Sequence, residues 1–259
     1  LTPEQCASLT QDMMWLVKKK INGQEVLVPH LYLTSVSPEK IAASKAAIGA
    51  NGNISLAATS INNQSSMFAG KNLSLSADLL RNTESLGAGG HLLLATRGDL
   101  QQDGRLFAQG DVRLLAAGQL TQNGSIDANN VIAIAQGNLL NTSAGKMNAA
   151  QNIFLQSTQG DVVNNQGQIN GNNITLDANK NVELTGNLSA QNNLKLIAGQ
   201  DVLLKATKVE ESVTSKKIKS NSVQYTATNL TAGGDITVDA GRDIQAEGSD
   251  FSAGGNINL

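Results

Sequence analysis

The feature that most constrains this chain is a polar residue that recurs about every twenty positions, each time followed by an aliphatic residue. A fixed turn residue with a period near twenty is typical of repeat architectures, in which each repeat forms one coil stacked on the next. We therefore expect a solenoid with a narrow, layered core. The recurring positions are Asn53, Asn72, His91, Asp111, Asn130, Asn152, Asn173, Asn193, Asp235 and Asn256.

Composition agrees with a narrow interior. Aromatic residues make up 3% and charged residues 15% of the 259 residues, against roughly 25% charged residues in average domains. The net charge of −2 gives no reason to expect nucleic acid or an anionic membrane surface as a partner. The single Cys6 excludes an intrachain disulfide and a multi-cysteine metal site. No apolar run approaches the roughly 20 residues of a membrane span, and no signal peptide opens the sequence.

Three apolar columns run through the repeats, and each has the alternation of a strand with one buried face. The first column follows the polar ladder: Ile54/Leu56, Leu73/Leu75, Leu92/Leu94, Val112/Leu114, Val131/Ala133, Ile153/Leu155, Ile174/Leu176, Leu194/Leu196, Ile236/Val238 and Ile257/Leu259. The second lies about eight residues further on: Ile61, Leu80, Leu100, Leu120, Leu139, Val162, Val182, Val202 and Ile244. The third ends in a small residue: Ile48/Ala50, Leu86/Ala88, Leu106/Ala108, Ile126/Ala128, Met147/Ala149, Ile169/Gly171, Leu188/Ala190, Leu230/Ala232 and Phe251/Ala253.

Three short strands per turn predict an all-β fold, a right-handed parallel β-helix of about nine coils of 19–22 residues over residues 48–259. The bends need positive φ or a tight backbone, which Gly and Asn tolerate better than other residues. Stacked Asn side chains are also able to bond to one another along the axis. A leucine-rich repeat has an overlapping period, but it needs a helical segment and a denser Leu framework than these Asn-, Gly- and Ser-rich segments offer.

One coil is longer than the rest. The interval from Leu194 to Ile236 spans about two periods, and the surplus of about 22 residues falls between the second and third columns. Its Val, Ile and Tyr residues amid Ser and Thr predict a β-hairpin insertion at about 208–229, with a turn near 216–221. Insertions in solenoids often form the binding face. The candidate partner or lipid-headgroup contacts are Lys208, Lys216, Lys217, Lys219 and Tyr225, although lysines on such strands also serve only to discourage unwanted pairing.

Residues 1–47 differ in kind from the repeats. Thr2, Pro3 and Gln5 match the start of a helix, with an N-cap, a proline at the first position and a capping box. Asn22-Gly23 predicts the turn of a hairpin between two apolar stretches, and Ser37-Pro38 is a candidate start of a second helix. We expect this helix and hairpin segment to cap the first coil, whose backbone is otherwise an open sheet edge.

No catalytic, cofactor-binding or metal-binding constellation is apparent in the sequence. Acidic residues share one corner of the repeat at Asp99, Asp161, Asp201 and Asp243, but amides alternate with them, which favours turn residues over a calcium ladder. His30 and His91 have no Cys or acidic cluster at metal-ligand spacing beside them. Cys6 falls on the apolar face of the predicted first helix and is expected to be packed there. The Gly-Gly pairs precede strands rather than helices, which excludes a phosphate-binding loop.

These residues resemble the filamentous-haemagglutinin-type repeat regions of two-partner-secreted exoproteins. The likeness rests on residues 232–244, Ala-Gly-Gly-Asp-Ile-Thr-Val-Asp-Ala-Gly-Arg-Asp-Ile, on the restart at 253–257 and on the Lys- and Ser-rich interruption before them. The opening Leu1-Thr-Pro-Glu-Gln5 with Trp15-Leu-Val17 is similar to a segment that precedes the second repeat region of CdiA-type contact-dependent inhibition proteins.

The resemblance implies a surface filament of a Gram-negative bacterium, exported by an outer-membrane two-partner-secretion transporter. It further implies that this region associates with the outer membrane or a surface receptor of a target cell and assists toxin delivery. An adhesin stalk that attaches to host cells is the alternative, because the same coils would serve it. A polysaccharide-cleaving β-helix enzyme is disfavoured, since it needs clustered acids and aromatic sugar platforms. We also expect the isolated chain to associate end to end through its exposed last strands.

Overall fold

The computed structural model describes residues 13–21, 24–32, 47–214 and 219–259, and it divides the chain into two compact units, 1–46 and 47–259. In the first unit, β1 (Met13–Ile21) and β2 (Gln24–Tyr32) pair antiparallel from Met13 with Tyr32 to Ile21 with Gln24. This pairing confirms the hairpin predicted around Asn22-Gly23. The two predicted helices, together with Cys6, lie outside the described residues, and the capping role of this unit stays a prediction.

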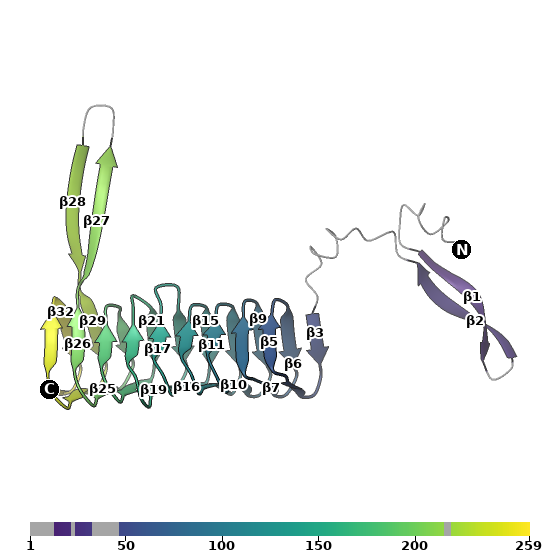
Figure 1. Cartoon of the computed structure of the whole chain (residues 1–259), viewed down its shortest axis with the longest axis horizontal. Helices are drawn as coiled ribbons and strands as arrows, with labels where there is room; N and C mark the ends of the chain where they lie inside the picture. Colours follow the sequence, from purple (N-terminus) through teal and green to yellow (C-terminus); the bar gives the residue numbers. More distant parts are fainter. Residues whose placement is uncertain (1–12, 22–23, 33–46, 215–218) are drawn as a thin grey trace. The chain divides into compact units, whose positions relative to one another are not determined.

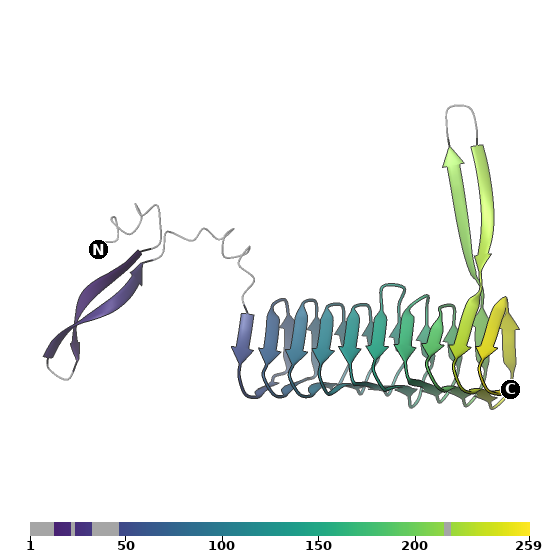
Figure 2. The same cartoon turned by 180° about the vertical axis from the view of Figure 1, so that it is seen from behind.

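The second unit is a parallel β-solenoid of three sheets with ten, nine and ten strands (Figures 1 and 2). The first sheet contains β4 (Ile54–Ala57), β7 (Leu73–Ala77), β10 (Leu92–Thr96), β13 (Asp111–Ala116), β16 (Asn130–Ala135), β19 (Asn152–Ser157), β22 (Asn173–Ala178), β25 (Leu194–Ala198), β30 (Ile236–Ala240) and β33 (Ile257–Asn258). The second contains β5 (Ser60–Asn63), β8 (Leu79–Asn82), β11 (Leu100–Gln102), β14 (Leu120–Gln122), β17 (Leu139–Asn141), β20 (Val162–Asn164), β23 (Val182–Leu184), β26 (Val202–Lys205) and β31 (Ile244–Glu247). The third contains β3 (Ala47–Ala50), β6 (Ser66–Ala69), β9 (Ser85–Ala88), β12 (Arg105–Ala108), β15 (Ser125–Ala128), β18 (Lys146–Ala149), β21 (Gln168–Gly171), β24 (Leu188–Ala190), β29 (Thr228–Ala232) and β32 (Ser249–Ala253).

The strand register confirms all three predicted columns. Leu92 pairs with Leu73 on one side and Val112 on the other, and the same in-register stacking joins the members of the second and third columns. Leu94, Leu120 and Leu106, one from each sheet, are 0% exposed. Fully burying such a side chain contributes roughly 1.5–3 kcal/mol, so the repeated core layers account for much of the stability. The part of the chain that the structure describes contains no helix, which excludes a leucine-rich repeat with helical segments over these residues.

The predicted polar ladder is continuous from Asn53 to Asn256. Each member's side chain bonds to the backbone N–H or the side chain of the next member, for example Asn72 N–H to Asn53 Oδ1 at 3.1 Å and Asn256 N–H to Asp235 Oδ1 at 2.7 Å. His91 takes its place in the ladder as an acceptor, since its Nδ1 receives the Asp111 N–H at 3.0 Å. The ladder therefore satisfies backbone donors at the entrance to the first sheet, which is a structural role.

Close stacking, rather than unusual backbone angles, explains most corner glycines. Among the described residues, only Gln166 and Gly248 have positive φ. A Cβ atom added to Gly124 would lie 1.7 Å from the Gly104 carbonyl oxygen of the preceding coil. Of the two reasons predicted for glycine at the bends, the tight backbone is thus the one that applies at this corner.

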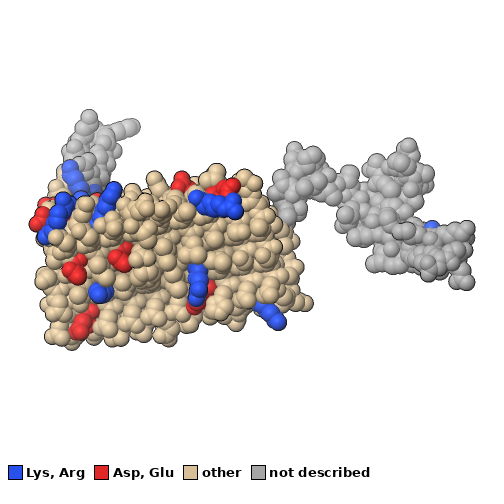
Figure 3. Space-filling view, turned by 60° about the horizontal axis from the view of Figure 1, so that its bottom comes forward, with Lys and Arg blue, Asp and Glu red and all other residues tan. Residues whose placement is uncertain are grey.

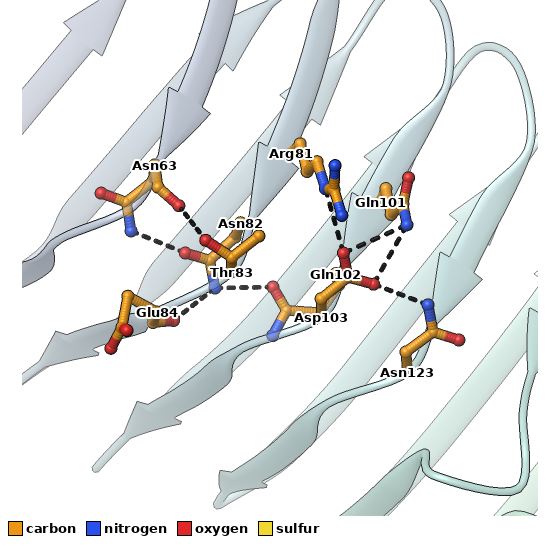
Figure 4. Close-up of polar contacts among 9 residues, drawn as sticks. All are labelled: Asn63, Arg81, Asn82, Thr83, Glu84, Gln101, Gln102, Asp103 and Asn123. Carbon is orange, nitrogen blue, oxygen red and sulfur yellow. Dashed lines mark hydrogen bonds and ion pairs between the residues drawn. The ribbon is translucent and has the colours of Figure 1, made fainter.

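A buried column of side-chain amides, which sequence reasoning missed, lies inside the second sheet. We call it the amide column; its members are Asn63, Asn82, Gln102, Gln122, Asn141 and Asn164, all at most 3% exposed. Asn63 Nδ2 donates to Asn82 Oδ1 at 2.7 Å, and Asn82 Nδ2 donates to Gln102 Oε1 at 2.9 Å (Figure 4). In the next coils the same register position holds Leu184 and Leu204. A polar column therefore replaces part of the aliphatic core over six coils.

The terminal coils expose residues that the inner coils bury. Ile48 and Leu56 are 50% and 40% exposed in the first coil, and Ile257 is 46% exposed in the last strand. Their counterparts further inside, such as Leu75, are almost completely buried. The expected end-to-end association remains a prediction, and a concentration series in sedimentation velocity tests it.

Candidate functional site: the projecting hairpin

The predicted insertion is an antiparallel hairpin of β27 (Thr207–Thr214) and β28 (Lys219–Thr226). It pairs from Thr207 with Thr226 to Thr214 with Lys219 and leaves the solenoid between the second and third sheets (Figure 1). Because β28 already begins at Lys219, the range 216–221 predicted for the turn extends too far. The coil resumes in register at once, since Leu188 of β24 pairs with Leu230 of β29.

Polar contacts attach the base of the hairpin to neighbouring coils. Thr207 Oγ1 donates to the Thr185 carbonyl oxygen at 3.1 Å, and the buried Thr228 Oγ1 donates to the Lys205 carbonyl oxygen at 2.7 Å. The Ala206 N–H donates to the Glu247 carbonyl oxygen at 2.8 Å. The hairpin therefore begins and ends at a point fixed by backbone and threonine hydrogen bonds.

The described part of the hairpin exposes apolar, aromatic and cationic side chains. Tyr225 is 69%, Val223 52% and Val209 38% exposed. Lys208 is also exposed and lies directly opposite Tyr225 in the strand pairing. The coils also expose some large apolar side chains, such as Leu79 at 56% and Phe68 at 47%, but the hairpin combines them with a cation and an exposed tyrosine. The combination is typical of residues that contact a partner or a headgroup region.

The structure describes the side chains of only two of the five predicted site residues. Lys208 and Tyr225 are brought together as a cross-strand pair. Lys219 begins β28 opposite Thr214, but its side chain lies outside the described atoms, and Lys216 and Lys217 lie outside the described residues. Their contact role stays a prediction.

The acidic corner consists of turn residues, as the sequence indicated. The expected alternation with amides is wrong at one end, because Asp201 and Asp243 lie in adjacent coils and Asp201 Oδ1 accepts the Asp243 N–H at 3.3 Å. Asp99 Oδ1 accepts the Gln119 N–H at 2.7 Å, and Asp161 Oδ1 accepts the Asn181 N–H at 3.0 Å. Among the described residues, no group of three or more His, Cys, Asp or Glu side chains is placed to hold a metal ion. Charged side chains are scattered over the face of the solenoid seen in Figure 3.

Two carboxylates outside that corner have perturbed acidity. Asp103 accepts hydrogen bonds from Asn123 Nδ2 at 2.6 Å and from Arg81 Nε at 3.1 Å (Figure 4). Burial raises the pKa of the Asp103 carboxyl, but hydrogen bonds from two amides and this guanidinium outweigh it and lower that pKa overall. A hydrogen bond from Asn130 is the main cause of the lowered pKa of Asp111. Both groups are ionised partners in surface networks, which is a structural role.

Sequence reasoning also missed an aromatic contact on the outer face of the third sheet. The rings of Phe68 and Phe107 stack with centroids 5.9 Å apart and an interplanar angle of 18°, although 39 residues separate them. Gly87 is the residue between them in the register. The available signal was their shared position: Phe107 follows the third-column residue Leu106, and Phe68 follows Met67, which occupies the same register position. Stacking through the register thus creates an aromatic surface that neither coil has by itself.

Comparison with known families identifies the repeats. A haemagglutinin repeat family model matches residues 41–104, 87–148 and 134–206, and a second haemagglutinin repeat model matches residues 211–259. The chain belongs to the haemagglutinin repeat family. The resemblance drawn from the glycine-rich coils is thereby confirmed, and the second match begins within the hairpin and runs through the coils that follow it. No solved structure matches the chain.

Curated relatives place these repeats in proteins of the CdiA type. The chain is 31% identical over its full length to a "tRNA nuclease CdiA" of Escherichia coli strain STEC_O31, and 30% identical over 82% of its length to that of Escherichia coli strain 536. A Yersinia mollaretii "tRNA nuclease CdiA" is 25% identical over 94% of the chain. The chain spans only 6–8% of the length of these relatives. The repeats and relatives support a structural segment of a large secreted filament, and the solenoid fits that role rather than the nuclease activity in the relatives' names. No helix among the described residues is long and apolar enough to span a membrane.

Proposed function

We propose that this chain is a delivery segment of a CdiA-type surface filament, which associates with the outer membrane of a target cell and assists entry of a toxin carried elsewhere in the protein. The observation that carries the proposal is the hairpin, the one long projection from the described coils. It leaves the stack without disturbing the register on either side. A contact element attached to a rigid rod in this way is free to engage a membrane while the rod keeps its shape.

The chemistry of the hairpin supports a membrane surface as the partner. Tyr225 and Val223 offer an aromatic and an apolar side chain, and aromatic rings with a polar tip are favoured at the boundary between headgroups and acyl chains. Lys208 beside them, and the further lysines of the insertion, suit the anionic groups of a bacterial outer surface. The proposal also includes the producing cell: an outer-membrane two-partner-secretion transporter exports the filament, which is then displayed on the surface of this Gram-negative bacterium.

A vesicle flotation assay with the purified chain tests the membrane contact. Vesicles made with lipopolysaccharide are expected to carry the chain upward, and Tyr225→Ala combined with Val223→Ser to abolish flotation. Phe154→Ala, which removes an outward aromatic ring from β19 of the first sheet, is the matched control and is expected to float like the unmodified chain. Equal flotation of the hairpin variant and the control would refute the role of the hairpin.

Removing residues 47–259 from a full-length filament separates delivery from adhesion. A delivery role predicts that cells still attach to their targets but no longer inhibit target-cell growth. An adhesin stalk predicts that attachment itself is lost.

A further inference from the structure

The third sheet carries a straight row of outward side chains along the solenoid, one from each successive strand. The register aligns them in the order Phe68, Gly87, Phe107, Asp127, Asn148, Asn170 and Ser189. Neighbouring members are separated by the interstrand distance of about 4.8 Å. The row therefore presents equally spaced contact groups in one direction, parallel to the axis.

One end of the row is aromatic. Phe107 lies over Gly87, since a Cβ atom built there would meet the Phe107 Cζ atom at 2.0 Å. The missing side chain lets Phe107 lean toward Phe68 and stack with it. The Arg105 guanidinium carbon lies 5.2 Å from the Phe107 ring centroid, which adds a cation–π contact. Phe68 remains 47% exposed, so the stack keeps an open apolar surface.

The remainder of the row consists of linked amides. Asn148 Nδ2 donates to Asp127 Oδ1 at 3.1 Å, and Asn170 Nδ2 donates to Asn148 Oδ1 at 3.0 Å. Asn148, Asn170 and Ser189 are exposed, and an amide uses only one of its two N–H groups in such a ladder. The ladder fixes these side chains in place and still leaves donors and acceptors directed outward.

Two adjoining hollows make this face a shallow groove. One has a volume of about 440 Å³ and includes Phe68 and Phe107; the other has a volume of about 480 Å³ and includes Asn148 and Asn170. They share Asp127, Ala128 and Ala150. Small residues at the end of the third column, such as Ala108 and Ala128, line the groove, and their short side chains leave this corner of the coil hollow.

The groove is electrically neutral. Among the described residues, Asp127 is the only charged one that lines either hollow, and its carboxylate pairs with Arg105 at 3.4 Å. An anionic ligand gains no cation from these linings, and a cationic ligand gains no free carboxylate. An uncharged ligand that is rich in hydrogen-bonding groups is the chemistry that matches.

We propose that this groove binds an extended neutral glycan. The C–H face of a sugar ring packs on an aromatic ring, and its hydroxyl groups both donate to and accept from side-chain amides. The row presents one position per strand at a spacing of about 4.8 Å, so an extended chain of sugar units passes the aromatic end first and then the amides. Binding without cleavage is expected, because the groove has a single, ion-paired carboxylate among its described residues and hydrolysis of a glycosidic bond typically takes two. The site is independent of the hairpin.

Titration of the purified chain with neutral hexasaccharides tests this proposal. Cellohexaose, chitohexaose and maltohexaose serve as probes in isothermal calorimetry, with hexagalacturonate as the anionic comparison. At least one neutral probe is expected to bind more tightly than hexagalacturonate. Truncating an aromatic anchor is among the most costly changes in an interface, so Phe68→Ala with Phe107→Ala should weaken this binding by about tenfold or more.

Two further variants distinguish the groove from other surfaces. Gly87→Ala keeps both rings but forces Phe107 away from its position, and should weaken binding while circular dichroism stays unchanged. Phe154→Ala removes an aromatic ring from a different sheet and should leave binding unaltered. The proposal is overturned if no neutral hexasaccharide binds, or if the double phenylalanine variant binds as tightly as the Phe154→Ala chain.

Discussion

The amide column permits a sharp test of how buried polar groups stabilise this solenoid. The test compares two substitutions of the same kind, Asn82→Leu and Gln122→Leu. Both side chains are 0% exposed, and both occupy the inner position at the end of a strand in the second sheet. Leucine fits this register position in the fold, as Leu184 shows.

The two sites differ in the hydrogen bonds that they hold. Asn82 accepts from Asn63 Nδ2 at 2.7 Å and donates to Gln102 Oε1 at 2.9 Å, so Asn82→Leu leaves one buried donor and one buried acceptor without these bonds. Gln122 donates only to the Gly124 carbonyl oxygen, at 2.9 Å, and that oxygen keeps the Lys146 N–H as a second donor. The Gln122 Oε1 atom itself accepts no hydrogen bond from the part of the chain that the structure describes.

These differences set the expected magnitudes. Each buried group left unsatisfied costs about 1–3 kcal/mol, so Asn82→Leu loses about 2–6 kcal/mol, against a gain of about 1.5–3 kcal/mol from burying leucine. Gln122→Leu gains the leucine and removes an unpartnered acceptor. Because the leucine contribution is common to both sites, we expect the free energy of unfolding to be lower for Asn82→Leu than for Gln122→Leu, and Gln122→Leu to leave it unchanged or raise it. The gap between the two variants should be at least about 2 kcal/mol.

Urea unfolding followed by far-UV circular dichroism measures this gap. Tryptophan fluorescence would not serve, because the single Trp15 lies in β1 of the other unit. Linear extrapolation gives the free energies, and equal m-values show that both variants unfold the same structure. An equal loss of unfolding free energy in the two variants would refute the reasoning. The effect of leucine would then depend on side-chain volume and not on the hydrogen bonds that each amide makes.

Three further predictions follow from the same coils. Hydrogen bonds lower the folded-state pKa of Asp103 and Asp111, so the stability that these carboxylates contribute is present above the unfolded-state pKa of about 3.9 and is lost as pH falls through the lower folded value. The midpoint of thermal unfolding should therefore stay constant near neutrality and fall below about pH 4. This fall should be shallower in the Asp103→Asn, Asp111→Asn double variant. Gly124→Ala should cost more than about 2 kcal/mol in urea unfolding because its Cβ meets a carbonyl oxygen, whereas Gly49→Ala, with no atom within 4 Å of its Cβ, should cost almost nothing; similar costs would contradict the role assigned to close coil stacking. Replacing residues 207–226 with a short Gly-Ser link should change the unfolding midpoint only slightly, since the coil on each side keeps its register; cooperative loss of the solenoid in this variant would show that the hairpin is part of the core.

Most of the solenoid follows from the sequence because every coil repeats the same constraint. A shift of one residue in any strand would turn its buried column outward, so the apolar pairs fix the register coil by coil. The long interval between Leu194 and Ile236 becomes interpretable for the same reason. The third column resumes at Leu230 after the surplus, and the spacing alone therefore places the insertion at one corner, where the strand pairing confirms it.

The amide column and the aromatic groove depend on contacts that the repeat period does not report. Asn82 has the sequence character of an exposed residue at a strand end, and its burial is tolerated because the amides above and below it and the Glu84 carbonyl oxygen all bond to its side chain. Phe68 and Phe107 lie in alternate coils with Gly87 between them, so neither has an aromatic neighbour in its own repeat. An aromatic content of 3% argued against a sugar platform, but register concentrates two of four phenylalanines at one place.

The solenoid separates the residues that fold it from those that are free to act. Along each strand the inward positions form the core, while the outward positions touch only their neighbours in adjacent coils. A change such as Phe107 to another residue therefore alters the surface row without removing a core contact of Leu106 beside it, which is 0% exposed. The hairpin uses the same freedom at a corner. Because a solenoid's stability is a sum over neighbouring coils, an insertion that begins and ends at one corner leaves every other interface intact, and this is why a rod of this kind is able to carry separate contact sites at fixed distances along its length.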